Sequence, residues 1–182
     1  MRIRETNVIL KNGQRIILRS PESQDAKVML DHMKLTSGES YFLVRYPEEI
    51  KRQVEAEESF LNTVCEDKKD VMIVACAGEK IIGCGSVMKV GEQLKCIHRA
   101  DMGISIQEKY CNEGLGAFMV KELLTYAKDN FEQIELGVFE DNSRAIHLYE
   151  KLGFKRFGVI PRAFKLKDGT YRDEIQMIYI NK

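Results

Sequence analysis

The sequence predicts one α/β domain over residues 1–182, with a mixed, mostly antiparallel sheet flanked by helices. Apolar, β-branched runs joined by short turns predict three antiparallel hairpins. Between the second and third hairpins, a strand, a glycine turn, a helix and another strand follow in order, and a right-handed crossover makes such strands parallel. A chain of 182 residues with 44% hydrophobic side chains suits one core and is short for two.

The chain opens with a predicted hairpin and helix. Residues 8–18 form two short runs around Asn12 and Gly13, a pair that supplies the positive φ angles of a two-residue turn. Ser20 can cap a helix and Pro21 suits the first helical position, so we expect the first helix to begin there.

The next segment predicts the end of that helix and the start of another. Residues 36–40, Thr-Ser-Gly-Glu-Ser, are expected to break the first helix. A second helix is expected to start near Pro47, with apolar residues such as Leu61 turned inward. Its carboxylates, Glu57 among them, are expected to lie mostly in solvent.

The middle of the chain predicts a meander followed by a strand-helix-strand unit. Residues 71–77 and 81–90 are apolar runs that form a hairpin, and a third strand at roughly 94–106 extends it. A helix with an apolar stripe starts after Gly114, and a strand at 134–139 follows it.

The C-terminal part predicts a short helix and a closing hairpin. The helix at residues 143–152 ends at Gly153, which suits a left-handed C-cap. Residues 157–166 and 171–180 then pair around a turn containing Gly169.

Composition excludes several classes of partner. Lys plus Arg and Asp plus Glu both total 28, so no net field attracts nucleic acid or an acidic membrane surface. Residues 1–6 carry charge where a signal peptide needs an apolar run, and no later stretch approaches the roughly 20 apolar residues of a membrane span. We therefore expect a cytoplasmic protein.

The five cysteines predict neither a disulfide framework nor a metal site. Their number is odd and no two form a C-x-x-C pair. We expect most of them to be small buried hydrophobic residues, and we expect no metal.

Residues 107–117 indicate an anion site. They lead from a β-rich stretch through a glycine-spaced turn into a helix, and a helix start presents free amides and partial positive charge. An ordinary strand-to-helix turn that needs Gly114 and Gly116 for packing is the alternative. No G-K-[ST] follows, which argues against a Walker loop for a nucleoside triphosphate. Met119 stands where the third glycine of G-x-G-x-x-G belongs, which argues against a dinucleotide-binding motif.

This segment and a second one together resemble the cofactor-binding motifs of the GNAT superfamily of acetyl-CoA-dependent N-acetyltransferases. The first resembles the family's pyrophosphate signature through Gly114 and Gly116, but it departs from it at Cys111, where the family usually has Gln or Arg. The second segment resembles the family's pattern of Asn, Ala and Tyr followed by Gly-Phe after a short helix, with Lys151 between Tyr149 and Gly153. The matching residues are Asn142, Ala145, Tyr149, Gly153 and Phe154.

The resemblance implies an acetyl-CoA site where two parallel strands, residues 101–106 and 134–139, splay apart. Unpaired groups of the first strand would hold the pantetheine arm, and an amide at Ile104 or Ile106 would polarise the thioester carbonyl. The implied cofactor-binding residues are Ile104, Ser105, Ile106, Cys111, Asn112, Glu113, Gly114, Leu115, Gly116, Ala117, Asn142, Ala145, Tyr149 and Lys151.

The resemblance also implies two catalytic residues. Tyr149 would protonate the departing thiolate, although a core tyrosine is the alternative, and Asp101 is the leading candidate for the base. Residues 101, 103 and 105 share one face of their strand and 102, 104 and 106 the other, so Asp101 meets the acceptor only if the strand's parity or a bulge permits it. Glu39, His98, Asp173 and Glu174 are the other candidate bases.

The acceptor is expected to be a primary amine on a small molecule, an amino acid or a protein N-terminus. Residues 38–46 and 162–172 would select it, and the candidate substrate-binding residues are Glu39, Tyr41, Phe42 and Arg45. A non-catalytic acyl-CoA sensor, an enzyme for a longer acyl chain and a ping-pong route through Cys111 with a lowered thiol pKa remain alternatives. A homodimer is left open.

Overall fold

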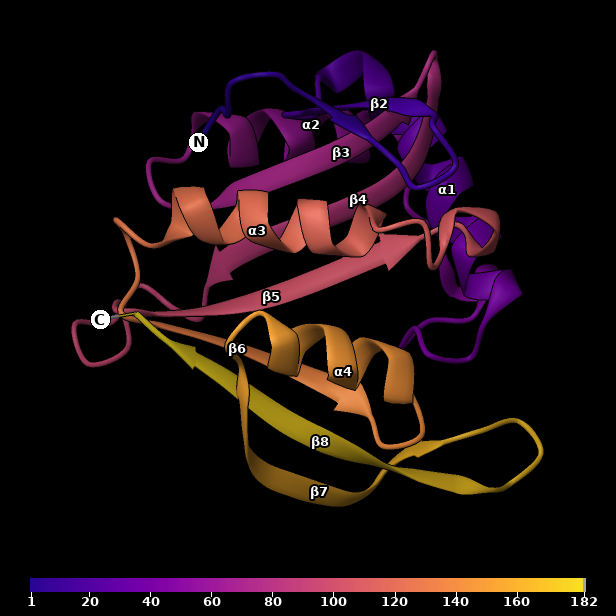
Figure 1. Cartoon of the computed structure of the whole chain (residues 1–182), viewed down its shortest axis with the longest axis vertical. Coiled ribbons are helices and arrows are strands. Elements are labelled where there is room, and N and C mark those ends of the chain that lie inside the picture. Colours follow the sequence, from indigo (N-terminus) through magenta and orange to yellow (C-terminus); the bar gives the residue numbers. More distant parts are fainter. Residues whose placement is uncertain (182) are drawn as a thin grey trace.

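The computed structural model describes residues 1–181, and within them eight strands form one mixed sheet with helices on both faces (Figure 1). The strand order is β1-β2-β3-β4-β5-β6-β8-β7. The strands are β1 (Thr6–Ile9), β2 (Arg15–Arg19), β3 (Val71–Ala77), β4 (Lys80–Lys89), β5 (Arg99–Ile106), β6 (Gln133–Phe139), β7 (Lys155–Lys165) and β8 (Tyr171–Ile180). The α-helices are α1 (Ala26–Glu39), α2 (Val54–Glu66), α3 (Leu115–Ala127) and α4 (Ser143–Lys151).

The predicted fold class is confirmed. Neighbouring strands pair antiparallel throughout the described sheet except β5 and β6, which pair parallel. Helix α3 connects these two, as a crossover connection must when the strands it joins run the same way. The sheet therefore consists of a β1–β5 meander and a β6–β8–β7 unit, joined at one parallel edge.

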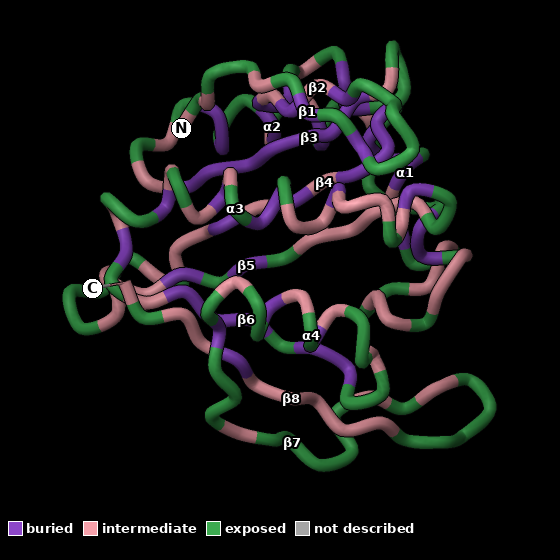
Figure 2. The backbone as a smooth tube through the Cα atoms, viewed as in Figure 1, coloured by how far each residue is buried: buried purple, intermediate pink, exposed green. Residues whose placement is uncertain are grey.

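Two apolar clusters cover the two faces of the sheet. The larger joins inward side chains of most strands to α3 and α4, including Met119 and Tyr149. The smaller joins β3 and β4 to α1 and α2, including Met29 and Leu61. In Figure 1, α3 and α4 lie on the face toward the viewer, and in Figure 2 the buried residues follow the central strands while β7 is largely exposed.

The three predicted hairpins are confirmed, with strand ends displaced by a few residues. Gly13 (φ 83°), Gly78 (φ 62°) and Gly169 (φ 86°) occupy the left-handed region at the three turns. Gly153 (φ 98°) follows α4 as predicted. Glycine is favoured at such positions because it has no Cβ to clash with the backbone.

The predicted limits of α1 are wrong. The helix begins at Ala26 after a 3₁₀ turn at Ser23–Asp25, and the Ser20 hydroxyl instead accepts a hydrogen bond from the Ile3 amide (2.8 Å). The helix also continues through residues 36–39, where the Thr36 hydroxyl donates to the His32 carbonyl (2.9 Å). Hydroxyls that bond within the helix do not break it, and burial of this turn supports it.

The predicted start of α2 and the position of Glu57 are also wrong. Pro47 begins a separate 3₁₀ turn, Pro47–Glu49, and α2 starts at Val54. Glu57 is only 1% exposed, because Arg52 donates a hydrogen bond to its carboxylate (2.6 Å) and stacks over Phe60. A nearby cation allows a carboxylate to be buried.

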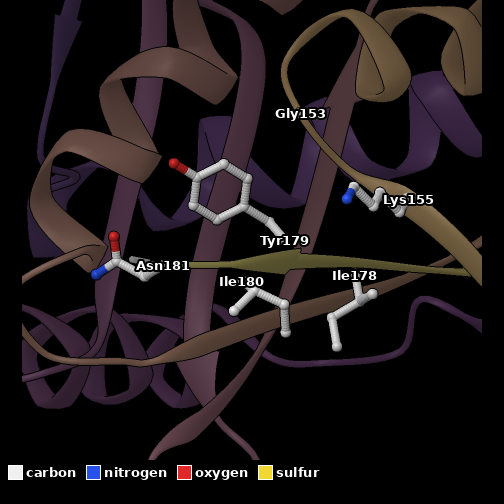
Figure 3. Close-up of a pocket in the computed structure, with 6 residues that line it drawn as sticks. All are labelled: Gly153, Lys155, Ile178, Tyr179, Ile180 and Asn181. Carbon is white, nitrogen blue, oxygen red and sulfur yellow. The ribbon is translucent and has the colours of Figure 1, made fainter.

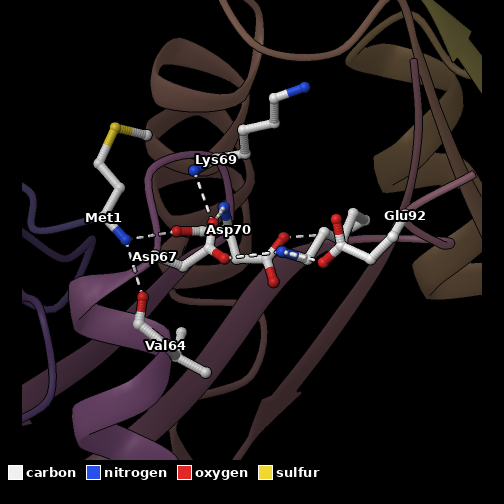
Figure 4. A network of polar contacts seen from close by, with 7 residues as sticks. Met1, Val64, Asp67, Lys69, Asp70 and Glu92 are labelled. Atoms are coloured by element: carbon white, nitrogen blue, oxygen red, sulfur yellow. Dashed lines mark hydrogen bonds and ion pairs between the residues drawn. The ribbon is translucent and has the colours of Figure 1, made fainter. Parts of the chain in front are cut away.

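A polar network fastens the α2–β3 turn to the N-terminus and to β4 (Figure 4). The Met1 amino group donates to the carbonyls of Val64 (2.8 Å) and Asp70 (2.6 Å). Lys89 pairs with Asp67 (2.7 Å), whose other oxygen accepts from the Asp70 amide (2.9 Å). Lys89 pairs with Ala100 of β5, so this network lies beside the paired start of β5 and serves the packing of α2.

Three further features bear on the predicted partners. None of the described helices is long and apolar enough to cross a membrane. All five cysteines are free. Across residues 1–181, no three His, Cys, Asp or Glu side chains are grouped so that they could hold a metal ion.

We predict that Arg52→Met destabilises the protein by about 3 kcal/mol, because it leaves the Glu57 carboxylate buried without its cation. Urea unfolding at pH 7 measures this change. The double variant Arg52→Met/Glu57→Gln is expected to recover much of the loss, since a neutral amide is cheaper to bury. Equal instability of the single and double variants would contradict the assignment.

Candidate functional site

The central feature of the candidate site is a parallel strand pair that separates. Strands β5 and β6 pair only at their starts, with Asp101 opposite Glu135 as the last pair. Farther along, β5 stays paired with β4 as far as Ile106, and β6 stays paired with β8 as far as Phe139. Residues 102–106 and 136–139 therefore face each other along unpaired edges, and we call this region the wedge.

Backbone alternation directs the amides of Ile104 and Ile106 into the wedge. The Arg99 carbonyl accepts from the Val90 amide (3.1 Å) and the Gln107 amide donates to the Ile82 carbonyl (3.0 Å), so odd-numbered residues direct their backbone groups toward β4. Even-numbered residues of β5 must then direct theirs toward β6. Within the described sheet these amides meet no partner strand beyond the last pair.

The glycine turn ends at a helix start whose amides are free. Gly114 (φ 88°) is the N-cap of α3, and Asn112 (φ 66°) also adopts the left-handed conformation. The first intrahelical bonds run from the amides of residues 117 and 118 to the Gly114 carbonyl, which leaves the amides of residues 115 and 116 without a helical acceptor. Such a helix start binds anions.

The two glycines serve different purposes. Glycine is favoured at residue 114 because of the positive φ, and not because of crowding, since a Cβ there would meet only Phe118. Gly116 needs space, since a Cβ there would lie 3.0 Å from Cδ2 of Leu148 and 3.5 Å from Cδ1 of Ile106. The absence of a side chain at residue 116 therefore lets α3 pack closely on α4 and β5.

Glu113 fixes this turn to the first hairpin. Its carbonyl accepts from the Lys11 amide (3.1 Å) and its carboxylate accepts from the Asn12 amide (3.0 Å). The carboxylate that directly precedes Gly114 is thus bound to the β1–β2 turn. This contact removes a negative side chain from the immediate helix start and holds the turn in place.

Cys111 does not have the lowered pKa that the ping-pong alternative needs. Burial raises the pKa of its thiol, and the nearby Arg144 guanidinium only partly opposes this shift. The thiol is therefore protonated at neutral pH and is a poor nucleophile. Arg144, in the first turn of α4, brings a cation to the position where Cys111 replaces the family's usual polar residue.

Tyr149 lies in a buried position on α4. Asn142 caps this helix by accepting from the Ala145 amide (3.1 Å), and Lys151 is exposed in its last turn. Tyr149 is 7% exposed, and its ring lies 5.7 Å from that of Phe154. Burial alone raises its pKa to about 12, so the phenol keeps its proton at neutral pH.

Asp101 lies on the opposite face of the sheet from Tyr149. Its cross-strand partner Met88, and Cys84 opposite Ser105, pack with α1 and α2, whereas Ala100 and Met102 pack with α3 and α4. Although Asp101 is exposed, partial desolvation and the Glu135 carboxylate raise its pKa. The α1/α2 face therefore carries the predicted base, and no bulge in β5 is needed to place it there.

Sequence reasoning missed a buried histidine beside the wedge. His32 of α1 is 2% exposed, and its Nε2 lies 2.9 Å from the Ser105 hydroxyl. Burial lowers its pKa to about 4, partly opposed by the Ile81 carbonyl, and in the described chain Nδ1 has no hydrogen-bond partner. The sequence could have indicated this burial, because His32 follows the apolar Met29 by three residues and so lies on the same, inward side of α1.

Three of the four predicted acceptor-binding residues contact segments at the open end of the wedge. The Tyr41 hydroxyl donates to Asp141 (2.7 Å), Phe42 lies 5.9 Å from the Phe139 ring, and Arg45 is exposed. The Glu39 carboxylate accepts from the Glu108 amide (2.8 Å) just beyond β5. The loop after α1 therefore meets the end of β6, as an acceptor-selecting loop would.

Of the remaining candidate bases, Glu174 alone lies on the α1/α2 face of the sheet next to the wedge, the face that carries Asp101. Asp173 accepts from the Arg162 amide (2.7 Å) within the last hairpin. His98 precedes β5 at the closed end of the wedge, where its carbonyl accepts from the Glu132 amide. The Glu174 side chain reaches across Gly137 of β6.

Two surface hollows lie at the closed end of the wedge. One, of about 450 Å³, is lined by Gly153, Lys155, Ile178, Tyr179, Ile180 and Asn181 (Figure 3). The other, of about 400 Å³, includes His98, Lys128 and Asn181. Because Gln133 at the start of β6 pairs with Ile180, neither hollow adjoins the unpaired edges. They do not belong to the candidate site.

Comparisons with known proteins agree with this geometry. A sequence model of the Acetyltransferase (GNAT) family matches residues 35–154. The chain is 32% identical over 108 residues to the L-amino acid N-acetyltransferase AaaT of Escherichia coli (strain K12), covering 58% of this chain and 65% of that protein. It is 27% identical over 171 residues to the spermidine N(1)-acetyltransferase of Escherichia coli (strain K12), covering 92% of this chain and 87% of that protein.

A solved structure is similar over nearly the whole fold. The acetyltransferase of the GNAT family from Streptococcus pneumoniae has a TM-score of 0.87 at 26% identity, covering 91% of this chain and 99% of that one. The chain spans slightly less than two thirds of the amino-acid acetyltransferase that it matches.

The chain therefore belongs to the acetyltransferase (GNAT) family, whose enzymes use acetyl-CoA. The residues present fit this cofactor, because an unpaired strand edge leads to a helix start with free amides. The first can accept an amide-containing arm and the second a pyrophosphate.

We predict that His32→Gln reduces the loss of stability in acid. The unfolded chain binds a proton at His32 near pH 6.5 and the folded protein only near pH 4, so stability falls as the pH falls through this window. The histidine should account for about 2 kcal/mol between pH 8 and pH 5. Urea unfolding at both pH values measures the difference, with the exposed His147→Gln as control, and identical slopes for wild type and His32→Gln would refute it.

Proposed function

We propose that this protein transfers the acetyl group of acetyl-CoA to a primary amine by direct attack in a ternary complex. The observation that supports this most is the wedge itself, with Tyr149 packed on one face of the sheet and the Asp101 carboxylate on the other. A thioester between the unpaired edges would have a proton donor on one side and a proton acceptor on the other.

In this proposal the cofactor lies along β5. The pyrophosphate binds the amides at the start of α3, with Arg144 supplying the cation that residue 111 lacks. The pantetheine arm bonds to the open edge of β5, and the amide of Ile104 or Ile106 stabilises the oxyanion. Bound there, acetyl-CoA supplies the activated acyl group.

The proposed proton transfers balance the reaction. Asp101, directly or through water, accepts a proton from the acceptor ammonium, and the amine nitrogen then forms a bond to the carbonyl carbon. As the carbon–sulfur bond breaks, Tyr149 donates its proton to the thiolate. The second proton of the attacking nitrogen returns to the Tyr149 phenolate through solvent, and the Asp101 proton leaves to bulk water.

We infer a small primary amine as the acceptor. The two relatives named above act on L-amino acids and on spermidine, and both substrates carry primary amines. Tyr41 and Phe42 supply aromatic groups at the open end of the wedge, and the exposed Arg45 belongs to the same loop, which suits a small amine or a peptide N-terminus.

A non-catalytic acyl-CoA sensor is the second candidate, favoured by Cys111 at the position of the family's usual Gln or Arg. Release of coenzyme A separates the two, when acetyl-CoA is offered with amino acids, polyamines, aminoglycosides and N-terminal peptides. Turnover on one class establishes the enzyme, tight binding without turnover favours the sensor, and absence of binding refutes both.

We predict that Tyr149→Phe lowers kcat roughly 100-fold, because the phenylalanine cannot protonate the thiolate. The Kd for acetyl-CoA should change less than about twofold, since burial of the ring is retained. Tyr179→Phe, another ring in contact with Phe154, is the matched control. A Tyr149→Phe variant with normal turnover would remove this residue from the chemistry.

We predict that Arg144→Ala raises the Kd for acetyl-CoA roughly tenfold through loss of a charge-assisted phosphate contact. Isothermal titration at two salt concentrations measures it, and the wild type should be the more salt-sensitive. Lys121→Ala, an exposed cation farther along α3, controls for net charge. Equal affinities of the Arg144 and Lys121 variants would show that Arg144 does not replace the missing side chain.

A further inference from the structure

Two glycines face each other where the wedge begins. Continuing the register of Asp101 and Glu135 by two residues places Gly103 of β5 opposite Gly137 of β6. Both lie on the α1/α2 face and both are exposed, and a Cβ built on Gly103 would meet nothing within 4 Å. No described side chain therefore covers Gly103 at the point where the strands separate.

Glu174 uses the space above one of these glycines. It lies opposite Phe139 in the β6–β8 ladder, so Gly137 is its diagonal neighbour on the same face. A Cβ at residue 137 would lie 2.5 Å from Cδ and 3.1 Å from Cγ of Glu174, and its Oε1 would be closer still. Only glycine at 137 allows this position of the carboxylate.

The carboxylate is oriented but has no cation. Gln176 donates from Nε2 to Oε2 (2.6 Å), which fixes the group and leaves Oε1 over Gly137. Among residues 1–181 Glu174 forms no ion pair, and burial raises its pKa. Oε1 of this partly desolvated carboxylate is therefore free to accept a charge-assisted hydrogen bond from a cationic ligand.

The charged groups around it leave Glu174 available for a ligand. Arg99 donates to both oxygens of Glu135 (2.6 and 2.7 Å), so that carboxylate is neutralised. Arg172 bonds to Asp141 (3.0 Å) at the end of β6. Asp101 adds a second negative charge on the α1/α2 face, so this part of the face attracts a cation.

We propose that Glu174 binds the attacking amino group of the acceptor in its cationic form. This assignment deepens the proposed function and rests on it, because it names the residue that selects an amine. An ammonium on Oε1 would lie over Gly137, across from Gly103 and beside the unpaired part of β5, where the amide of Ile104 or Ile106 holds the thioester carbonyl. Asp101, two residues and about 7 Å before Gly103 along β5, then takes the proton through bridging water.

The remainder of the acceptor would extend toward the open end of the wedge. Phe139, opposite Glu174, stacks on Phe164 at 3.9 Å and contacts the ring of Phe42. These rings offer an apolar wall beside the carboxylate, which suits the methylene chain of an alkyl amine.

Glu174→Gln tests the assignment through the division between KM and kcat. It should raise KM for the amine roughly 10- to 100-fold, because a charge-assisted contact is lost, with KM for acetyl-CoA unchanged. Asp101→Asn should lower kcat instead. Gly137→Ala retains the charge but displaces it, and should raise KM for the amine as Glu174→Gln does. Glu132→Gln, an exposed carboxylate elsewhere, should have no effect.

Direct binding separates this inference from the proposed function. Titration of spermidine into the coenzyme A complex should give binding to the wild type and to Glu132→Gln, and at least tenfold weaker binding to Glu174→Gln and Gly137→Ala. Equal binding by all variants, or none by the wild type, would overturn the role of Glu174. Binding with the expected pattern but no turnover would support Glu174 and count against catalysis.

Discussion

The site depends on the fact that β5 and β6 pair at one end only. The three-residue ladder and the two-pronged contact of Arg99 with Glu135 hold the closed end. Each strand is then kept by its antiparallel neighbour, β5 by β4 and β6 by β8, so neither can return to the other. The unpaired edges are therefore present before any cofactor arrives.

Strand alternation then divides the chemistry between two faces. Because successive side chains point to opposite sides, the residues adjoining the wedge supply apolar packing for α3 and α4 on one face and carboxylates on the other. Tyr149 is buried in the first environment, which keeps its proton, while Asp101 stays at the surface of the second. A thioester lying in the wedge would be reached by an acid and by a base from different sides. One separated strand pair thus positions groups that are nearly 50 residues apart in the chain.

The sequence predicted the features that follow from local rules and missed those that need distant partners. Turn glycines and alternating apolar runs specify the hairpins, and the turn at Gly114 specifies the helix start. Glu57 is buried because Arg52 donates a hydrogen bond to it. Helix α1 continues to Glu39 because its last turn is packed against the rest of the protein. The hydrophobic periodicity of the sequence predicts neither of these interactions. The sequence also did not determine which face of the sheet carries Asp101, because that depends on the register between β5 and β4. The sequence offered Glu174 as one of several candidate bases, and only the structure shows that its carboxylate lies over Gly137.

The cofactor half and the acceptor half of the site are held by separate contacts. Glu113 binds the glycine turn to the first hairpin, and Gly116 packs α3 on α4. On the acceptor side, Asp141 receives bonds from Tyr41 and from Arg172, which joins the loop after α1 to the last hairpin. Neither contact of Asp141 touches the helix start that would hold the pyrophosphate, and Glu39 bonds to Glu108, before the glycine turn. Changes in the acceptor-side loops can therefore alter which amine is bound while the unpaired edge of β5 and the α3 amides remain as they are.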